Sequence, residues 1–287
     1  MNDYRIIDLQ QWTCLNKEGD RGSGLFYINP EEPGVILKTT RRAEEFSRDN
    51  VVKEFYTSKA VYDLGIPTPR MIEIVRIDDR FGIKSEWIKD KKSYARLAGE
   101  NPGDMDSIAA QMAVHGRELH AAQAIGSEWL PSMKEKMLQA VTSTLMVEGK
   151  AKEELQHFVE GLEDAPNLLH GNFTFTNVIV ENGKTYWIDL GRAAHGLPLF
   201  DLGHFFLYCH YFAKQDRVNN IAHMNEEQIL QFWNSFALAY NGSDGLDEFT
   251  AECKRFAAID VVLLGHIQTL NWHERLFLGL LAKSMFK

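Results

Sequence analysis

Short apolar segments separated by turn residues dominate roughly the first 90 positions of the chain. Leu25–Ile28 and Val35–Lys38 are largely apolar, and they flank the turn-forming stretch Asn29–Gly34. This pattern predicts a β-hairpin. Two further strands are expected over Met71–Ile77 and Phe81–Ile88, so the front of the chain should form a small β-sheet.

Helical spacing of apolar residues marks one segment of this front part and most of the remaining chain. Apolar residues recur at helical intervals from roughly Glu44 to Leu64, and Gly65–Pro69 then ends the pattern. Helical spacing dominates after about Lys89, and a second helix-rich block begins at about Asp201. The positions that indicate these later helices are Ile108, Met112, His115 and Leu119; Met133, Met137 and Val141; Ile229–Tyr240; and Phe249–Leu270.

A strand-like island interrupts the helical part. Val178–Val180 and Thr185–Ile188 are strand-forming, and Asn182-Gly183 between them favours the positive φ angles of a tight turn. Because a hairpin brings its two ends together, we expect Asn177 and Asp189 to lie side by side. An amide oxygen and a carboxylate are suitable ligands for Mg²⁺, so the island predicts a metal site.

A β-rich front and a helical back with one embedded hairpin predict an α+β fold in two lobes. The chain has 287 residues, which suits one large domain or two modest lobes with a core each. We expect a small β-rich lobe over residues 1–89 and a larger, mostly helical lobe over residues 90–287.

The composition excludes some classes of function. The chain is 45% hydrophobic and 25% charged with a net charge of −9, which argues against a uniformly basic nucleic-acid surface and favours cationic substrates only weakly. Cys14, Cys209 and Cys253 are too far apart for a zinc site or a disulfide framework. No signal-peptide pattern and no apolar run of about 20 residues is present, so a cytoplasmic protein without a membrane partner is the simplest expectation.

The segment around the island resembles a known family. His170-Gly171-Asn172, with Asn177 five residues later and Asp189-Leu190-Gly191 after the hairpin, is similar to the catalytic loop and metal-binding motif of kinases. The His-Gly pair and the segment Gly196–Gly203 resemble the branch of aminoglycoside phosphotransferases and choline kinases. The match is strong over residues 168–204 and looser over 19–90. It implies a bilobal protein-kinase-like fold.

The resemblance also implies a role for individual residues. ATP or GTP with Mg²⁺ would be the cofactor, and the hydroxyl of a small molecule would be the acceptor. Asp201 would anchor the catalytic loop. The implied ligands are Asn177 and Asp189 for the metal, Lys38 with its ion-pair partner Glu54 for the phosphates, Gly22, Ser23 and Gly24 in the loop over the phosphates, and Glu86, Trp87 and Ile88 for the adenine.

Asn172 departs from the pattern, because the family has its catalytic aspartate at this position. Asparagine accepts a hydrogen bond but cannot take a proton at neutral pH, and general-base catalysis typically contributes about 10²–10⁴-fold. Phe173–Thr176 supply no histidine or carboxylate within the loop. Four readings stay open: a slow kinase, an enzyme with another base or an ionised acceptor, a nucleotide-binding pseudokinase, or a deliberate inactivating substitution.

Several residues have plainer interpretations when they are taken alone. Lys38 and Glu54 would each be ordinary surface residues, and His170 is expected to be structural. Five further residues suit a site for an amine or a quaternary ammonium group, but aromatic residues at helical spacing more often belong to a core. These five are Trp233, Tyr240, Trp272, His273 and Glu274. The sequence does not fix the oligomeric state.

Overall fold

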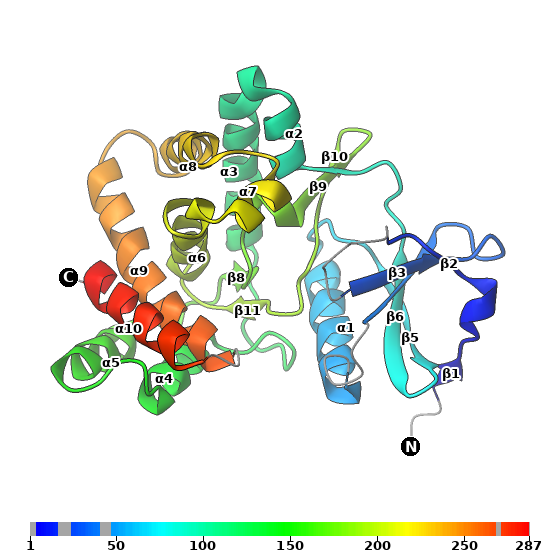
Figure 1. Ribbon diagram of the computed structural model, residues 1–287, viewed down its shortest axis with the longest axis horizontal. Helices are drawn as coiled ribbons and strands as arrows, with labels where there is room; N and C mark the ends of the chain where they lie inside the picture. Colours follow the sequence, from blue (N-terminus) through cyan, green and yellow to red (C-terminus); the bar gives the residue numbers. More distant parts are fainter. Residues whose placement is uncertain (1–3, 17–23, 41–46, 268–270, 287) are drawn as a thin grey trace. The chain divides into compact units, whose positions relative to one another are not determined.

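The structure, a computed structural model, describes residues 4–16, 24–40, 47–267 and 271–286. The fold is mixed α+β and forms two compact units (Figure 1). The first unit is Met1–Lys91 together with Ile179–Arg192, and the second is Lys92–Val178 together with Ala193–Lys287. The first contains the β-sheet and the second is mostly helical, which confirms the predicted fold class.

The sheet of the first unit has the strand order β1-β5-β6-β4-β3-β2. Antiparallel pairs β3–β4 and β5–β6 are the two hairpins that the sequence predicts, whereas β1 runs parallel to β5. The strands are β1 (Arg5–Ile6), β2 (Thr13–Cys14), β3 (Gly24–Ile28), β4 (Val35–Thr40), β5 (Met71–Ile77) and β6 (Arg80–Glu86), and the 3-10 helix η1 (Leu9–Gln11) lies between β1 and β2.

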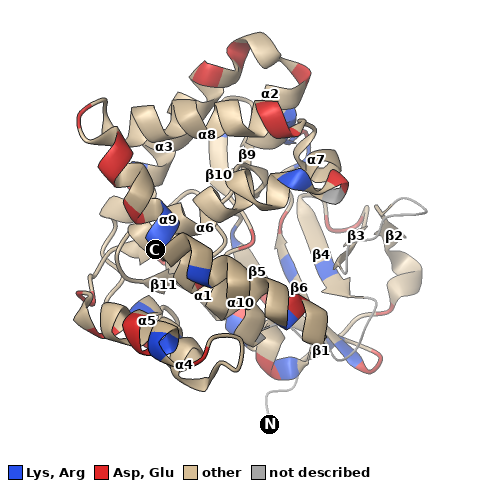
Figure 2. Cartoon of the chain, turned by 60° about the vertical axis from the view of Figure 1, so that its left-hand side comes forward, with Lys and Arg blue, Asp and Glu red and all other residues tan. Residues whose placement is uncertain are grey.

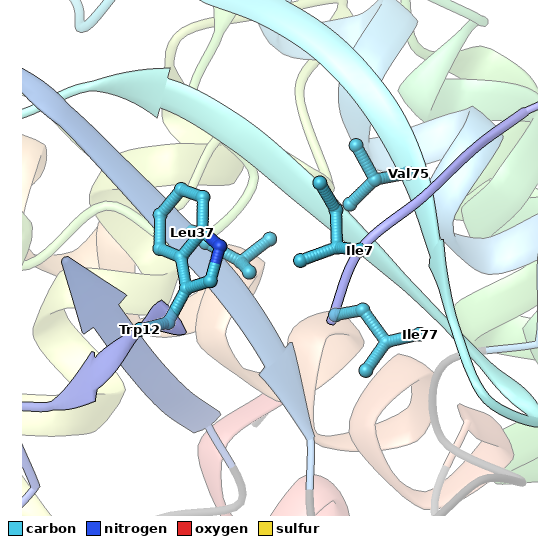
Figure 3. Packing of buried hydrophobic residues seen from close by; sticks show 5 residues of the cluster. All are labelled: Ile7, Trp12, Leu37, Val75 and Ile77. Carbon is cyan, nitrogen blue, oxygen red and sulfur yellow. The ribbon is translucent and has the colours of Figure 1, made fainter. Parts of the chain in front are cut away.

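The two faces of this sheet pack against different partners. On one face, Trp12 and Leu37 belong to a cluster of buried side chains (Figure 3), whose other members are Ile7, Val75 and Ile77. On the other face lies helix α1 (Arg48–Asp63), which packs on Ile74 and Ile83. Successive side chains of a strand point to opposite faces, so Lys38, the residue after Leu37, faces α1.

Helix α1 confirms the helix expected at this point of the chain. Ser47 caps its first turn by accepting a hydrogen bond from the Asn50 N–H. It ends at Asp63, shortly before Gly65, whose φ of 83° does not suit a helix. The predicted start at Glu44 lies outside the described residues.

The predicted hairpin of the island is also confirmed. Strands β9 (Val178–Glu181) and β10 (Lys184–Trp187) are joined by Asn182 and Gly183, whose φ angles are 50° and 77°. Two positive φ values in a two-residue loop are typical of a type I′ turn. The Trp187 N–H donates to the Pro67 carbonyl, which ties the hairpin to the N-terminal part of the first unit.

The second unit is built mainly from helices. Among the described residues, no helix has the length and apolar character needed to cross a membrane. The helices are α2 (Tyr94–Glu100), α3 (Met105–Ala121), α4 (Met133–Ser143), α5 (Lys150–Gly161), α6 (Leu199–His210), α7 (Asp216–Ala222), α8 (Glu226–Asn241), α9 (Leu246–Ile267) and α10 (Trp272–Phe286), and the short elements are β7 (Lys92–Ser93), η2 (Pro102–Asp104), β8 (Leu168–Leu169), η3 (Phe175–Asn177), β11 (Ala194–His195) and η4 (Phe212–Lys214).

Helices α6 and α9 form an unusually close pair within this unit. A Cβ added to Gly203 would lie only 2.6 Å from the Cβ of Phe256, so a larger residue at position 203 would force the two helices apart. Glycine therefore sets how closely α6 approaches α9.

Many acidic residues of the chain lie in the first turns of helices. Figure 2 shows Asp and Glu in red on several helices. The first turn of α8 contains Glu226 and Glu227, and the first turn of α9 contains Asp247 and Glu248. Carboxylates at these positions interact favourably with the helix dipole. Part of the net charge of −9 thus has a structural explanation.

Candidate active site

An ion pair connects the sheet of the first unit to its helix. The Lys38 Nζ lies 2.6 Å from the Glu54 Oε1, and both side chains are partly exposed. Burial alone would lower the pKa of Lys38, but the negative charges of Glu54 and Asp189 and the hydrogen bond to Glu54 outweigh it, so this pKa lies above its ordinary value. The lysine is therefore a fixed positive charge at neutral pH.

Asp189 belongs to the same unit and has an unusual backbone. Its φ is 62°, in the left-handed region that residues other than glycine seldom adopt and that occurs often at functional sites. Two residues later, a Cβ added to Gly191 would lie 3.2 Å from the Cγ of Glu54. The segment Asp189–Gly191 thus passes beside the ion pair. The structure brings Lys38, Glu54 and Asp189 together, and the Lys38–Glu54 pair is the part of this group that the resemblance implied.

The start of strand β3 is held by a residue that the sequence did not single out. The Asn16 Nδ2 donates to the Gly24 carbonyl at 3.0 Å, and the Phe26 N–H donates to the Asn16 Oδ1 at 2.7 Å. This amide fixes where the chain enters the strand. The other two predicted loop residues, Gly22 and Ser23, lie outside the described residues.

The predicted adenine segment follows strand β6. The N–H of Glu86 donates to the Arg70 carbonyl and the N–H of Trp87 donates to the Gly34 carbonyl. Ile88 is buried. The first two N–H groups of this segment are therefore used within the unit, which leaves the segment's other backbone groups as candidates for contact with a base.

In the second unit, Asp201 at the start of α6 holds the backbone of the predicted catalytic loop. Its two carboxylate oxygens accept the N–H groups of His170 at 2.6 Å and Gly171 at 2.8 Å. The Nδ1 of His170 accepts the Asn172 N–H at 3.2 Å. These contacts confirm the anchoring role expected for Asp201 and the structural role expected for His170.

Asp201 also pairs with a buried histidine from α3. The His120 Nε2 lies 3.1 Å from its Oδ2, and the His120 Nδ1 lies 2.8 Å from the Tyr240 hydroxyl. Burial alone would raise the pKa of Asp201, but the hydrogen bond and charge of His120 and the charge and N–H of His170 outweigh it, so this pKa lies below its ordinary value. Asp201 is therefore an ionised anchor.

The two phenylalanines of the predicted catalytic loop are core residues of the second unit. Phe173 and Phe175 are fully buried. The ring of Phe173 stacks on His120 at 5.4 Å between centroids, and both phenylalanine rings pack edge-on against Phe205 of α6. Aromatic side chains thus hold the loop on the helices between its two asparagines.

Asn177, at the end of η3, is oriented by the same loop. Its Nδ2 donates to the Asn172 carbonyl at 2.8 Å. Since only the amide nitrogen donates, its Oδ1 is the end of the group that can act as a metal ligand. Asn177 lies in the second unit and Asp189 in the first, and their expected proximity stays a prediction.

A histidine from outside the loop contacts the side chain of Asn172. The His204 Nε2 lies 3.1 Å from the Asn172 Oδ1, and the His204 Nδ1 lies 2.8 Å from the Asp260 Oδ2. Both His204 and Asp260 are buried. The sequence reasoning missed this pair. One signal was available, since His204 follows Asp201 by three residues and so lies on the same side of its helix.

The residues considered for acceptor binding divide into buried and exposed groups. Trp233 is buried among aromatic rings of α6 and α8, so the core interpretation holds for it. Tyr240 is half-buried, and its hydroxyl contacts His120. Trp272 is 68% exposed. Within the described residues, no group of three or more His, Cys, Asp or Glu side chains has the arrangement of a metal site.

Most of the chain matches one family model. Residues 23–228 match the phosphotransferase enzyme family (APH). The chain belongs to this family. The matched span includes Lys38, Glu54, Asn172, Asp189 and the anchor Asp201, so these residues are positions within a phosphotransferase domain.

Solved structures of phosphotransferases share the fold at low identity. The ADP-bound aminoglycoside phosphotransferase APH(2'')-Ib is 16% identical with a TM-score of 0.59, and the alignment covers 96% of this chain and 94% of that one. The streptomycin–ATP complex of APH(2")-IIa is 19% identical with a TM-score of 0.55, covering 96% and 92%. A choline/ethanolamine kinase family protein from Mesorhizobium loti is 11% identical with a TM-score of 0.56, covering 96% and 88%. No curated protein matches.

Proposed function

We propose that this member of the phosphotransferase family is a Mg²⁺-dependent kinase that transfers a phosphoryl group from ATP or GTP to a hydroxyl of a small molecule. The observation that carries the proposal is the grouping of Lys38, Glu54 and Asp189 in the first unit. A lysine held by one carboxylate next to a second, strained one suits the binding of a metal-bound polyphosphate.

Each nucleotide-binding residue has a proposed contact. Lys38 bonds to phosphate oxygens, and Glu54 keeps its ammonium group in place. The loop with Gly22, Ser23 and Gly24 covers the phosphates with its N–H groups. For the base, we propose the carbonyl of Glu86 and the N–H of Ile88, because the N–H groups of Glu86 and Trp87 already have partners. ADP and ATP in the related structures support this assignment.

Asn177 and Asp189 are the proposed metal ligands. The fit rests on their chemistry, since the Asn177 amide presents its oxygen as the acceptor end and Asp189 offers a carboxylate. Bound Mg²⁺ supplies charge neutralisation at the phosphates. The protein's own contribution is to orient the Asn177 side chain through its hydrogen bond to the Asn172 carbonyl and to carry Asp189 on the segment Asp189–Gly191, which passes beside Glu54.

At the acceptor end, Asn172 stands where the family has aspartate. Its amide accepts or donates a hydrogen bond and so positions a hydroxyl. Phosphoryl transfer depends mostly on positioning and charge neutralisation, so losing the base reduces the rate without removing the reaction. The acceptors in the related complexes, such as streptomycin, are not carried over, because the fold hosts many acceptors.

A second candidate function is a nucleotide-binding regulatory protein without turnover. The observation that favours it is Asn172 itself. Turnover at about 1–100 s⁻¹, which is typical of kinases, would exclude this alternative. Failure to transfer phosphate to any acceptor, before and after Asn172→Asp, would exclude the enzyme.

The proposal is tested by thermal unfolding with and without Mg-ATP or Mg-GTP. Nucleotide at 100 times its Kd should add about 2.7 kcal/mol to the free energy of unfolding. Asp189→Ala should abolish the Mg²⁺-dependent shift, whereas Asp63→Ala, which removes an exposed carboxylate of the same unit, should leave it unchanged. Asn172→Asp should leave binding unchanged and raise turnover. No shift with either nucleotide would refute the proposal.

A further inference from the structure

Glu181, the last residue of β9, binds two peptide groups from a distant part of the sequence. Its Oε1 accepts the N–H of Lys89 at 2.8 Å and the N–H of Asp90 at 3.2 Å. All three residues belong to the first unit, and Glu181 is half-buried. A hydrogen bond from an N–H to a carboxylate is roughly twice as strong as one between neutral groups. One charged oxygen therefore fixes two consecutive residues of the backbone.

These two residues directly follow the predicted adenine segment, Glu86–Ile88. The start of this segment is held from the sheet, because the Trp87 N–H donates to the Gly34 carbonyl at 2.8 Å. The stretch after its end is held by the Glu181 carboxylate. Ile88, whose N–H is the proposed donor to the base, therefore lies between two fixed points of the backbone.

Side chains contribute less to holding the backbone after Ile88. Ile88 is 3% exposed, whereas Lys89 and Asp90 are both exposed. The Lys89 ammonium group lies 5.0 Å from the centre of the Trp87 ring, and a cation–π contact at an exposed site is weaker than a hydrogen bond to a charged group. The two hydrogen bonds to Glu181 are therefore the stronger restraint on this stretch.

The hairpin gives the Glu181 carboxylate a fixed place. Glu181 directly precedes the turn Asn182-Gly183, and the Trp187 N–H of the second strand donates to the N-terminal part of the same unit at 2.8 Å. Asp189, the proposed metal ligand, follows this second strand. One hairpin therefore carries the anchor of the base segment next to its turn and a proposed metal ligand after its other end.

We propose that Glu181 is a positioning residue for the nucleotide base: by fixing Lys89 and Asp90, it holds the Ile88 N–H where this group can bind the base. It acts through the backbone and not by its own contact with the nucleotide. The inference rests on the proposed function, in which Glu86–Ile88 contacts the base. Because Glu181 serves the base and not the triphosphate, the two parts of the nucleotide should respond differently to its removal.

Amide hydrogen exchange, measured by NMR on the full chain without ligand, tests the first step. Glu181→Ala should make the Lys89 and Asp90 N–H groups exchange about tenfold faster, since a hydrogen bond of ordinary strength corresponds to roughly that factor. The Trp87 N–H, which is bonded to Gly34, should keep its exchange rate. Unchanged exchange at Lys89 and Asp90 would overturn the proposal.

Binding of two probes tests the second step. Calorimetric titration with Mg-tripolyphosphate reports on the phosphate site, and titration with Mg-ATP or Mg-GTP, whichever binds the wild type more tightly, reports on the phosphate and base sites together. The Kd of tripolyphosphate divided by the Kd of the nucleotide measures the contribution of the nucleoside. Glu181→Ala should reduce this ratio about tenfold by raising the Kd of the nucleotide. An unchanged ratio, including one in which both Kd values rise equally, would mean a purely structural role and overturn the proposal.

Two further variants make the comparison specific. Glu181→Gln keeps an acceptor oxygen without the charge, so it should lower the ratio by only about threefold. If Glu181→Ala does not fold, a wild-type ratio in Glu181→Gln overturns the proposal. The matched control is Asp79→Ala, which removes an exposed carboxylate at the turn between β5 and β6 of the same unit and should leave the ratio and the exchange rates unchanged.

The same titrations separate this inference from the proposed function. If neither Mg-tripolyphosphate nor a Mg-nucleotide binds the wild type, the proposed function fails and the inference falls with it. If the nucleotide binds the wild type more tightly than tripolyphosphate and Glu181→Ala has the same ratio, the proposed function stands and the role of Glu181 fails. A ratio that is lowered in the Glu181 variants and not in Asp79→Ala supports both.

Discussion

Two buried histidine–aspartate pairs contact the predicted catalytic loop, and they contact different parts of it. In the pair His120–Asp201, the carboxylate accepts the backbone N–H groups of His170 and Gly171. In the pair His204–Asp260, the histidine contacts the side chain of Asn172. The first pair fixes the path of the loop and the second reaches the residue at the family's catalytic position.

The second partner of each histidine explains this difference further. His120 meets the Tyr240 hydroxyl, which donates or accepts a hydrogen bond by rotating its hydrogen. His204 meets an amide, whose donor and acceptor are different atoms. The contact of His120 with the hydroxyl therefore works in either direction of the hydrogen bond, whereas the contact of His204 depends on which end of the Asn172 amide faces it.

The largest expected effect comes from breaking the first pair. Asp201→Ala leaves two buried N–H groups and His120 without their carboxylate, which should cost about 3–5 kcal/mol of stability. Chemical denaturation measures this loss. Glu128→Ala, at an exposed position, is the control and should stay within about 0.5 kcal/mol of the wild type. A loss below about 1 kcal/mol for Asp201→Ala would contradict the anchoring role.

Breaking the second pair should cost less. Asp260→Ala removes the carboxylate partner of the buried His204 Nδ1 and leaves that polar atom unpaired, so we expect a loss of about 1–3 kcal/mol. The same denaturation experiment applies. A double-mutant cycle with His204→Ala should show a coupling between the two residues, and additive losses would argue against a direct interaction.

Removing the hydroxyl of Tyr240 should cost less stability than either of these two changes. Burial raises the pKa of Tyr240, so this hydroxyl stays protonated and available to His120. Tyr240→Phe removes one hydrogen bond and should cost about 1 kcal/mol. Because His120 keeps its contact with Asp201, the loop should stay in place, and the ¹⁵N NMR signal of the Asn172 side-chain amide should be unchanged. A shifted amide signal would show that the two pairs are not independent.

The smallest expected effect is a difference in how steeply the free energy of unfolding decreases with falling pH. The pKa of Asp201 is lowered in the folded state, so its stabilising contribution is complete above the unfolded value of about 3.9 and is lost as the pH falls through the folded value. Unfolding free energies between pH 2 and 6 should therefore decrease more steeply for the wild type than for Asp201→Asn. Equal slopes would show that the charge of Asp201 contributes nothing.

Much of the fold and part of the site follow from local sequence patterns. The family resemblance implies the ion pair of Lys38 with Glu54, and the local pattern agrees with it, since Lys38 ends an apolar strand and Glu54 lies on the following helix. The Asn182-Gly183 dipeptide predicts the hairpin, and the position of Asp201 in a family motif predicts the loop anchor. Each of these signals depends on residues that are close in sequence or on a fixed spacing.

The pair His204–Asp260 depends instead on the tertiary packing of two helices. Asp260 is an isolated carboxylate in the apolar run Ala257–Val262, and such a residue needs a buried partner. The sequence does not say which partner, because α6 and α9 meet only in the folded unit. The same holds for Phe173 and Phe175, whose burial against α6 is invisible in the loop itself.

The contact between His204 and Asp260 depends on Gly203. Gly203 precedes His204 in α6, and Phe256, which Gly203 contacts, lies one helical turn before Asp260 in α9. The close approach of the two helices at Gly203 therefore also sets the His204–Asp260 distance. A methyl group at position 203 would push α6 and α9 apart and so lengthen the His204–Asp260 distance, although both polar side chains would still be present. A residue with no side chain therefore controls a contact between two buried polar side chains on different helices.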